Sequence, residues 1–166
     1  MGIYFTISAI LYIIIFIVNL FSKKTIQNVE TKIYKVLIVS TFIGLCFEVI
    51  SFVLFALGID TSSIWYIISA KAVFVYFITW IAYFTYYIYA ISFNNKYDEL
   101  EYNFHIQKIG TIFNIVIIVL SIVAMVLPVE FNVNGNVVFP TGLSVDLVYA
   151  TVGVFIVLCF IYAFRN

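Results

Sequence analysis

The sequence predicts an all-α membrane protein, a bundle of five transmembrane helices with a small extracellular β-hairpin between helices four and five. Of its 166 residues, 65% are hydrophobic and 10% are charged, whereas soluble domains carry about 25% charged residues. Five apolar runs approach or exceed the roughly 20 residues that a helix needs to cross a bilayer. The stretch between the fourth and fifth runs contains Asn-Gly-Asn, which is typical of a hairpin turn. We therefore expect residues 1–166 to form a single transmembrane domain with the lipid bilayer as its solvent.

The first helix is expected at residues 3–21. We interpret it as a retained helix and not as a signal peptide, because it lacks a basic leader and a small-residue cleavage site. A polar segment, Ser22–Lys35, follows it. Within this segment Ile26, Val29 and Ile33 recur at helical spacing, which favours a short helix lying on the membrane surface.

The other four helices are expected at residues 36–57, 64–93, 109–127 and 145–164. A short turn, Gly58–Ser63, makes helices two and three antiparallel neighbours. A charged linker, Asn94–Lys108, precedes helix four, and it contains the single histidine, His105, as a solvated side chain. Pro128 ends helix four because proline has no N–H to continue the helical hydrogen bonds.

The stretch between helices four and five has the alternation of a β-hairpin, with an irregular loop as the alternative. A three-residue loop at 134–136 would place four apolar side chains on one face of the hairpin: Phe131, Val133, Val137 and Phe139. A two-residue Asn134-Gly135 turn would scatter them over both faces, because side chains alternate along a strand. We therefore favour the longer loop, with Asn136 in the left-handed conformation.

The distribution of basic residues predicts the orientation of the chain in the cell membrane. Lysine and arginine in short loops mark the cytoplasmic side. The first loop contains the main topology-setting residues, Lys23, Lys24, Lys32 and Lys35. Further basic residues flank the third loop and follow the last helix, and the second and fourth loops contain none. The N-terminus is therefore expected outside, the C-terminus in the cytoplasm and the hairpin outside.

Two charged residues, Glu48 and Lys71, fall inside the predicted spans of helices two and three. At about 1.5 Å of rise per residue, they lie roughly 13 and 10 Å below the outer surface. A charge at mid-membrane costs at least about 2.5–3.5 kcal/mol on insertion scales. We expect the two side chains to form an ion pair that removes much of this cost. Two alternatives stay open, namely that Lys71 extends to the outer headgroups and that Glu48 is protonated.

A third acidic residue, Asp146, enters helix five from its outer end and completes the candidate intramembrane polar site with Glu48 and Lys71. The alternative is a solvated carboxylate at a helix N-terminus, which the helix dipole favours. Small and polar residues mark the face of helix two that we expect to turn inward, because such residues gather where membrane helices pack. These residues are Ser40, Gly44, Glu48 and Ser51.

Helix three carries an aromatic stripe, which indicates either helix packing with an interfacial belt or the wall of a ligand cavity. Its members are Tyr76, Trp80, Tyr83 and Tyr87.

No catalytic or nucleotide-binding motif occurs in the chain, so we predict no catalytic residues, no cofactor, no metal site and no enzymatic activity. Cys46 and Cys159 lie in apolar runs and are expected to be packing residues. The zero net charge and the lack of a basic tract argue against nucleic-acid binding.

The order of several features resembles a known family. Phe21–Lys35 reads F-S-K-K-x-I-x-N-x-E-x-K-I-Y-K, and an apolar run, Leu37–Glu48, follows it. Later come Leu127-Pro128, the Asn-Gly-Asn turn and Phe139–Gly142. This arrangement resembles the multi-pass N-terminal region of sensor histidine kinases from low-GC Gram-positive bacteria. The resemblance covers essentially the whole chain and is most specific at Ser22–Tyr34.

The resemblance implies a sensory input module, whose helices pass a signal to a cytoplasmic dimerisation and ATP-binding module. The phosphoacceptor box and the ATP-binding motifs of such kinases are absent from this sequence. We therefore expect a non-catalytic part of a two-component sensor, an N-terminal piece of a longer kinase. The alternative function is a small transport or channel subunit that uses the intramembrane charges, and a structural membrane partner is a third. Homodimerisation is left open by the sequence.

Overall fold

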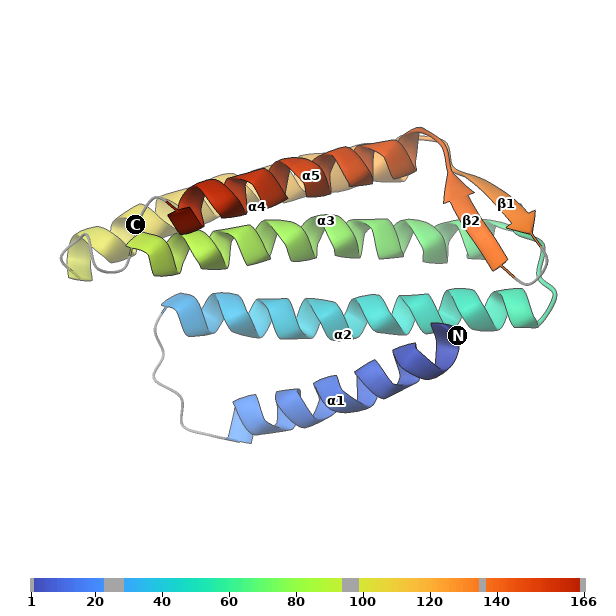
Figure 1. Cartoon of the computed structure of the whole chain (residues 1–166), viewed down its shortest axis with the longest axis horizontal. Coiled ribbons are helices and arrows are strands. Elements are labelled where there is room, and N and C mark those ends of the chain that lie inside the picture. The colour runs from blue at the N-terminus through green and yellow to red at the C-terminus, as the bar shows by residue number, and fades with distance from the viewer. Residues whose placement is uncertain (1, 23–28, 94–98, 135–136, 165–166) are drawn as a thin grey trace.

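Five helices and one two-stranded hairpin make up the structure, a computed structural model that describes residues 2–22, 29–93, 99–134 and 137–164 (Figure 1). The elements in chain order are α1 (Gly2–Ser22), α2 (Val29–Ala56), α3 (Ile64–Phe93), α4 (Glu99–Val126), β1 (Glu130–Asn134), β2 (Val137–Thr141) and α5 (Leu143–Phe164). The hairpin lies at one end of the bundle, which we call the hairpin end. The C-terminal ends of α3 and α5 lie at the opposite end of the bundle, which we call the far end.

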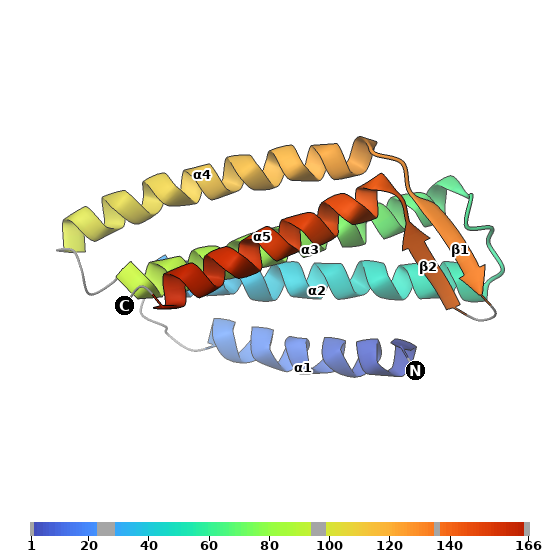
Figure 2. The ribbon, with the colours of Figure 1, turned by 45° about the horizontal axis from the view of Figure 1, so that its top comes forward.

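The central element of the bundle is α3, which packs against α2 on one side and against α4 and α5 on the other (Figures 1 and 2). The outermost helix, α1, packs against α2. Three clusters of buried apolar side chains follow α3 along its length, and α3 contributes to each of them. The predicted face of α2 is confirmed as a packing face, because Gly44 is buried against the ring of Tyr76 on α3.

Among the described residues, four helices are long and apolar enough to cross a membrane. Their candidate spans are Val29–Ala56, Ile64–Phe93, Glu101–Val126 and Leu143–Phe164. These spans are consistent with a multi-pass membrane protein, and the structure is mostly helical. In α1, the apolar segment among the described side chains is shorter, Ile7–Val18. A count of five transmembrane helices therefore stays a prediction.

Two helices begin earlier than the hydrophobic pattern predicts, and both do so at the far end. The structure starts α2 at Val29 and α4 at Glu99. Val29 and Ile33 therefore belong to α2 and not to a separate surface helix, and the prediction of a linker that extends to Lys108 is wrong. Ile26, the third residue of the predicted surface helix, lies outside the described residues. The polar residues there contain no glycine or proline that would stop a helix. Ile33 and Ile106 continue the packing face of these helices and are only 4% and 0% exposed.

The turn between α2 and α3 is built on a left-handed glycine. Gly58 has φ +72°, a conformation that costs glycine little because it has no Cβ. The N–H of Ile59 donates to the carbonyl of Leu54, and the N–H of Gly58 donates to that of Phe55. This pair of bonds is a Schellman motif, which satisfies the last carbonyls of α2 and reverses the chain.

The hairpin is confirmed, but its predicted register is wrong. Asn134 pairs with Val137 and Phe131 pairs with Pro140, so two residues and not three connect the strands. The predicted left-handed Asn136 lies outside the described residues. In the observed register Phe131 and Phe139 are on opposite faces, because Phe139 is opposite Asn132. Phe131 packs edge-on against Tyr66 of α3, with ring centroids 5.0 Å apart, and this contact turns its face towards the bundle.

Candidate functional site

Lys71 of α3 makes two short polar contacts at the hairpin end. Its Nζ donates hydrogen bonds to the carbonyl oxygens of Met125, at 2.6 Å, and of Leu127, at 2.8 Å. Both carbonyls belong to the C-terminal end of α4, where a helix carries about half a negative charge and has unsatisfied acceptors. The ammonium therefore caps α4 from a neighbouring helix.

Ser144, in the first turn of α5, binds two further carbonyls at this helix end. Pro128 has no N–H to donate to Ala124, four residues earlier, and the hydroxyl of Ser144 donates to that carbonyl instead, at 2.9 Å. The backbone N–H of Ser144 donates to the carbonyl of Pro128. Ser144 is fully buried. We call Lys71, Ser144 and the α4 carbonyls that they bind the carbonyl clamp.

The carbonyl clamp joins three helices directly beneath the hairpin. Lys71 belongs to α3, the carbonyls to α4 and Ser144 to α5. Gly142, with φ +103°, lets β2 pass close to Pro128, since a Cβ at this position would lie 3.3 Å from the Pro128 carbonyl oxygen. The hairpin is therefore in close contact with the ends of α4 and α5.

Between the clamp and the far end, α4 and α5 are separated by an apolar groove of about 430 Å³. Its walls include Ile112, Val116, Leu120, Ala150, Val154 and Leu158. The two helices are thus less tightly packed against each other than each is against α3. Their relative position depends on α3 and on the contacts at their ends.

Glu48 lies on the α2 face that packs against α3, as its spacing predicts. It is partly buried and close enough to Tyr76 of α3 for the two groups to interact electrostatically. One turn further, the hydroxyl of Ser51 donates to that of Ser69 across the same interface, at 3.0 Å. The structure shows Lys71 bonded to α4, and an additional ion pair between Lys71 and Glu48 stays a prediction.

Asp146 is exposed in the first turn of α5. This position gives its carboxylate the favourable field of a helix N-terminus, as the alternative interpretation has it. The backbone N–H of Asp146 donates to the carbonyl of Gly142 and so forms part of the start of α5. A polar space shared by Asp146 with Glu48 and Lys71 stays a prediction.

At the far end, the structure reveals a second polar cluster that the hydrophobic pattern does not predict. The hydroxyl of Tyr89 on α3 lies 2.7 Å from Nε2 of His105 on α4, so the prediction of a solvated linker histidine is wrong. Tyr102 of α4 donates to the carboxylate of Glu30 on α2, at 2.9 Å, and lies 3.1 Å from the carbonyl oxygen of Ala90. We call these five residues the far-end cluster.

The far-end cluster joins all the helices except α1. Tyr89 stacks on Phe93, with centroids 4.5 Å apart, and meets Tyr162 of α5 edge-on at 5.0 Å. One sequence signal could have revealed the cluster: Tyr102, His105 and Ile106 recur at i, i+3 and i+4, the spacing of a packed helix face. The charged residues around them, which are typical of a loop, conceal this spacing.

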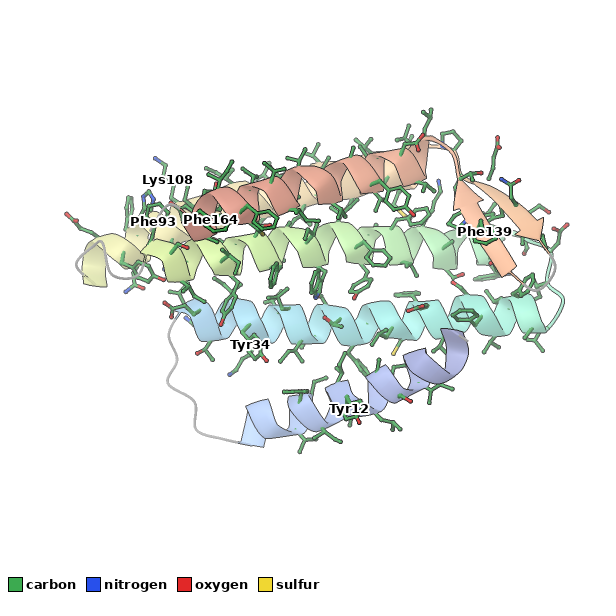
Figure 3. All side chains as sticks on the ribbon, viewed as in Figure 1. Tyr12, Tyr34, Phe93, Lys108, Phe139 and Phe164 are labelled. Carbon is green, nitrogen blue, oxygen red and sulfur yellow. The ribbon has the colours of Figure 1, made fainter. Side chains whose placement is uncertain are left out.

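The topology-setting lysines that are described also lie at the far end. Lys32 and Lys35 occupy the first turns of α2, and Lys108 lies near the start of α4. Figure 3 shows Lys108 at the same end of the bundle as Phe93 and Phe164, the opposite end from Phe139 of the hairpin. Lys23 and Lys24 lie outside the described residues.

The site thus consists of two polar clusters at opposite ends of α3, connected by continuous helices. A scan of protein-family models and searches of curated proteins and of solved structures find no match to this chain.

Proposed function

We propose that this chain is a non-catalytic sensory input module of the cell membrane. A signal at the hairpin end changes how α4 and α5 pack on α3, and the change reaches the far-end cluster. The observation that carries this proposal is the carbonyl clamp, in which one lysine and one serine hold the ends of two helices directly beneath the hairpin.

The clamp is suited to switching because its contacts are few and exchangeable. Lys71 reaches its two acceptors through a flexible side chain and can exchange them for water or for an anionic headgroup. A signal shifts such an equilibrium only if it binds one packing more tightly than the other. The apolar groove between α4 and α5 leaves these helices room to move relative to each other.

For the orientation, we propose an outside N-terminus, an outside hairpin and a cytoplasmic far end. The positions of Lys32, Lys35 and Lys108 at the far end support this orientation, because basic residues stay in the cytoplasm. A membrane-impermeant thiol reagent applied to intact cells should modify a cysteine placed at Phe139 and spare one placed at Lys108. The reverse pattern would invert the proposed topology.

We propose that the helices pass the signal to a histidine kinase module. The support for this output is the resemblance of Phe21–Glu48 to the N-terminal region of sensor histidine kinases. The second candidate is a transport or channel subunit. It is favoured by the polar seam between α2 and α3, where Glu48 lies near Tyr76 and where Ser51 binds Ser69.

The test compares Lys71→Met with Lys71→Arg in the whole chain, reconstituted in lipid nanodiscs. Spin labels at Lys32 and Lys108, in a chain whose native cysteines are replaced by serine, report the far-end distance between α2 and α4. The sensory proposal expects Lys71→Met to change this distance distribution and Lys71→Arg to preserve it. Ion and solute flux is measured in parallel in vesicles. An unchanged distance, together with flux that is lost in Glu48→Gln, would favour the transport candidate.

A further inference from the structure

The exposed side of α4 carries a second helix-packing seam, which borders the side that faces α3. Its residues are spaced by alternating steps of four and three: Gln107, Thr111, Asn114, Ile118, Ser121 and Met125. All are exposed except Ser121, which is partly buried. Steps of four and three are the heptad spacing by which two helices pack along their whole length. Helix α4 also lies at the edge of the bundle (Figure 2), where a further helix can reach it.

Asn114 is the polar centre of this seam. It lies twelve residues before Val126, about 18 Å from the hairpin end of α4, and five residues after Ile109, where the apolar run begins. The carboxamide is therefore at a depth where hydrocarbon surrounds the bundle. Its Oδ1 accepts a hydrogen bond from the hydroxyl of Tyr83, at 2.7 Å. The two hydrogens on Nδ2 have no acceptor among the described residues.

An exposed amide with free donors is costly at this depth. A polar group that loses water without gaining a hydrogen bond costs on the order of a few kcal/mol in an apolar medium. Thr111, one turn earlier, avoids this cost because its hydroxyl donates to the carbonyl of Gln107 in its own helix. Asn114 makes no such bond within α4, so its donors are open to an acceptor on another helix.

We propose that the seam is the interface for a second copy of this chain, with Asn114 of one copy bound to Asn114 of the other. Two copies inserted in one membrane have the same orientation, so paired α4 helices are parallel and each residue of the seam faces its own counterpart. A carboxamide is both donor and acceptor. Its oxygen can accept from Tyr83 and from the facing Nδ2 at once.

The chemistry of the seam favours this occupant over a different membrane protein. The seam has no charge that would demand an opposite charge on a partner. A single asparagine in a heptad seam sets the register and the dimeric state of parallel helices. Thr111 and Ser121 are small, which lets two backbones approach closely. The proposal is independent of the sensory function, since a dimer of this kind also suits a channel subunit.

The first experiment measures association of the full chain in lipid vesicles by energy transfer between donor-labelled and acceptor-labelled copies at increasing dilution in lipid. Asn114→Leu should weaken association about 5- to 30-fold, the range for a polar contact between membrane helices. Asn114→Gln keeps the amide and should retain most of the association. Thr111→Val removes an exposed hydroxyl whose bond stays within α4, and it should change association less than about 2-fold.

The second experiment leaves Asn114 in place and maps the interface by disulfide formation. In a chain with Cys46 and Cys159 replaced by serine, Ile118→Cys should crosslink two copies readily. Val119→Cys, which is similarly exposed at 53% but rotated by about 100° around α4 from Ile118, should crosslink much less. Equal crosslinking at both positions, or energy transfer unchanged in Asn114→Leu, overturns the proposal.

Discussion

Lys71 on α3 donates a hydrogen bond of 2.6 Å to the carbonyl oxygen of Met125, at the end of α4. This contact supplies the Lys71 ammonium with an acceptor and the end of α4 with a donor. An ammonium group within a membrane span needs partners, and a helix that ends at a proline has carbonyls without donors. The two segments are far apart in the sequence, so the contact also fixes how α4 returns to α3.

The first prediction concerns the strength of this cap. Lys71→Met should lower the free energy of unfolding by about 1–3 kcal/mol, because it leaves the carbonyls of Met125 and Leu127 without their donor. Lys71→Arg should recover most of the loss, since the guanidinium offers donors at similar reach. Unfolding in mixed micelles of increasing SDS content measures the difference. Equal stability of all three proteins would show that water already satisfies these carbonyls.

A double-mutant cycle separates the cap from the predicted ion pair. Lys71→Met and Ser144→Ala act on one helix end, so their effects should not add. If Lys71 also pairs with Glu48, then Glu48→Gln should cost less in the Lys71→Met background than in the wild type. Additive effects of the Glu48 and Lys71 substitutions would exclude the ion pair and leave the cap as the role of Lys71.

The second prediction tests the close approach of α2 and α3. A Cβ at Gly44 would overlap the ring of Tyr76, so Gly44→Ala should destabilise the bundle by about 1–3 kcal/mol. Gly153→Ala is the matched control, because nothing lies within 4 Å of a Cβ there. We expect the control to change stability by less than about 1 kcal/mol, measured by the same SDS unfolding. Tyr76→Leu combined with Gly44→Ala should recover part of the loss.

The sequence predicts the helices better than their ends. The span of α3, Ile64–Phe93, agrees with the prediction at both ends, because the Gly58–Ser63 turn on one side and a polar stretch on the other bound its apolar run. Helices α2 and α4 begin seven and ten residues before the predicted starts, at Val29 and Glu99. A hydrophobic run marks where a chain enters lipid, whereas a helix continues into the polar region as long as its packing face continues.

The candidate site was less predictable, for a physical reason. The partners of Lys71 are backbone carbonyls, and these exist at every residue and leave no trace in the sequence. The spacing of Gly44 and Ser51 did predict the packing face of α2, because small side chains are themselves the signal. The hairpin register was missed because the turn that sets it was assigned three residues on the assumption that Phe131 and Phe139 share a face.

The third prediction is a pH dependence of the turn between α2 and α3. The backbone N–H of Ser62 donates to the carboxylate of Asp60, at 3.1 Å, and holds the pKa of Asp60 below its ordinary value of 3.8. A lowered pKa stabilises the fold above the unfolded pKa, and this contribution is lost as the pH falls through the folded pKa.

Asp60→Asn isolates this effect, because the amide oxygen still accepts the bond from Ser62 but does not titrate. At pH 7 the wild type should be the more stable protein, because a carboxylate accepts this bond more strongly than an amide oxygen does. As the pH falls from about 5 to 2, the wild type should lose more stability than the variant, with the main change below about pH 4. Parallel curves for the two proteins over this range would mean that the turn does not hold the charged form.

The fourth prediction concerns the far-end cluster. Tyr102 is only 6% exposed and its hydroxyl contacts the carboxylate of Glu30, at 2.9 Å, and the carbonyl oxygen of Ala90. Tyr102→Phe should destabilise the bundle by about 1–2 kcal/mol, because it leaves two partly or fully buried acceptors without this donor. Tyr149→Phe, at a side chain that is 72% exposed, is the matched control and should be near neutral.

Hydrogen exchange locates the effect: the first turns of α2 and α4 should exchange faster in Tyr102→Phe and at the wild-type rate in Tyr149→Phe. If exchange rises instead at the hairpin end, the two ends of the bundle are more tightly coupled than the apolar groove between α4 and α5 suggests.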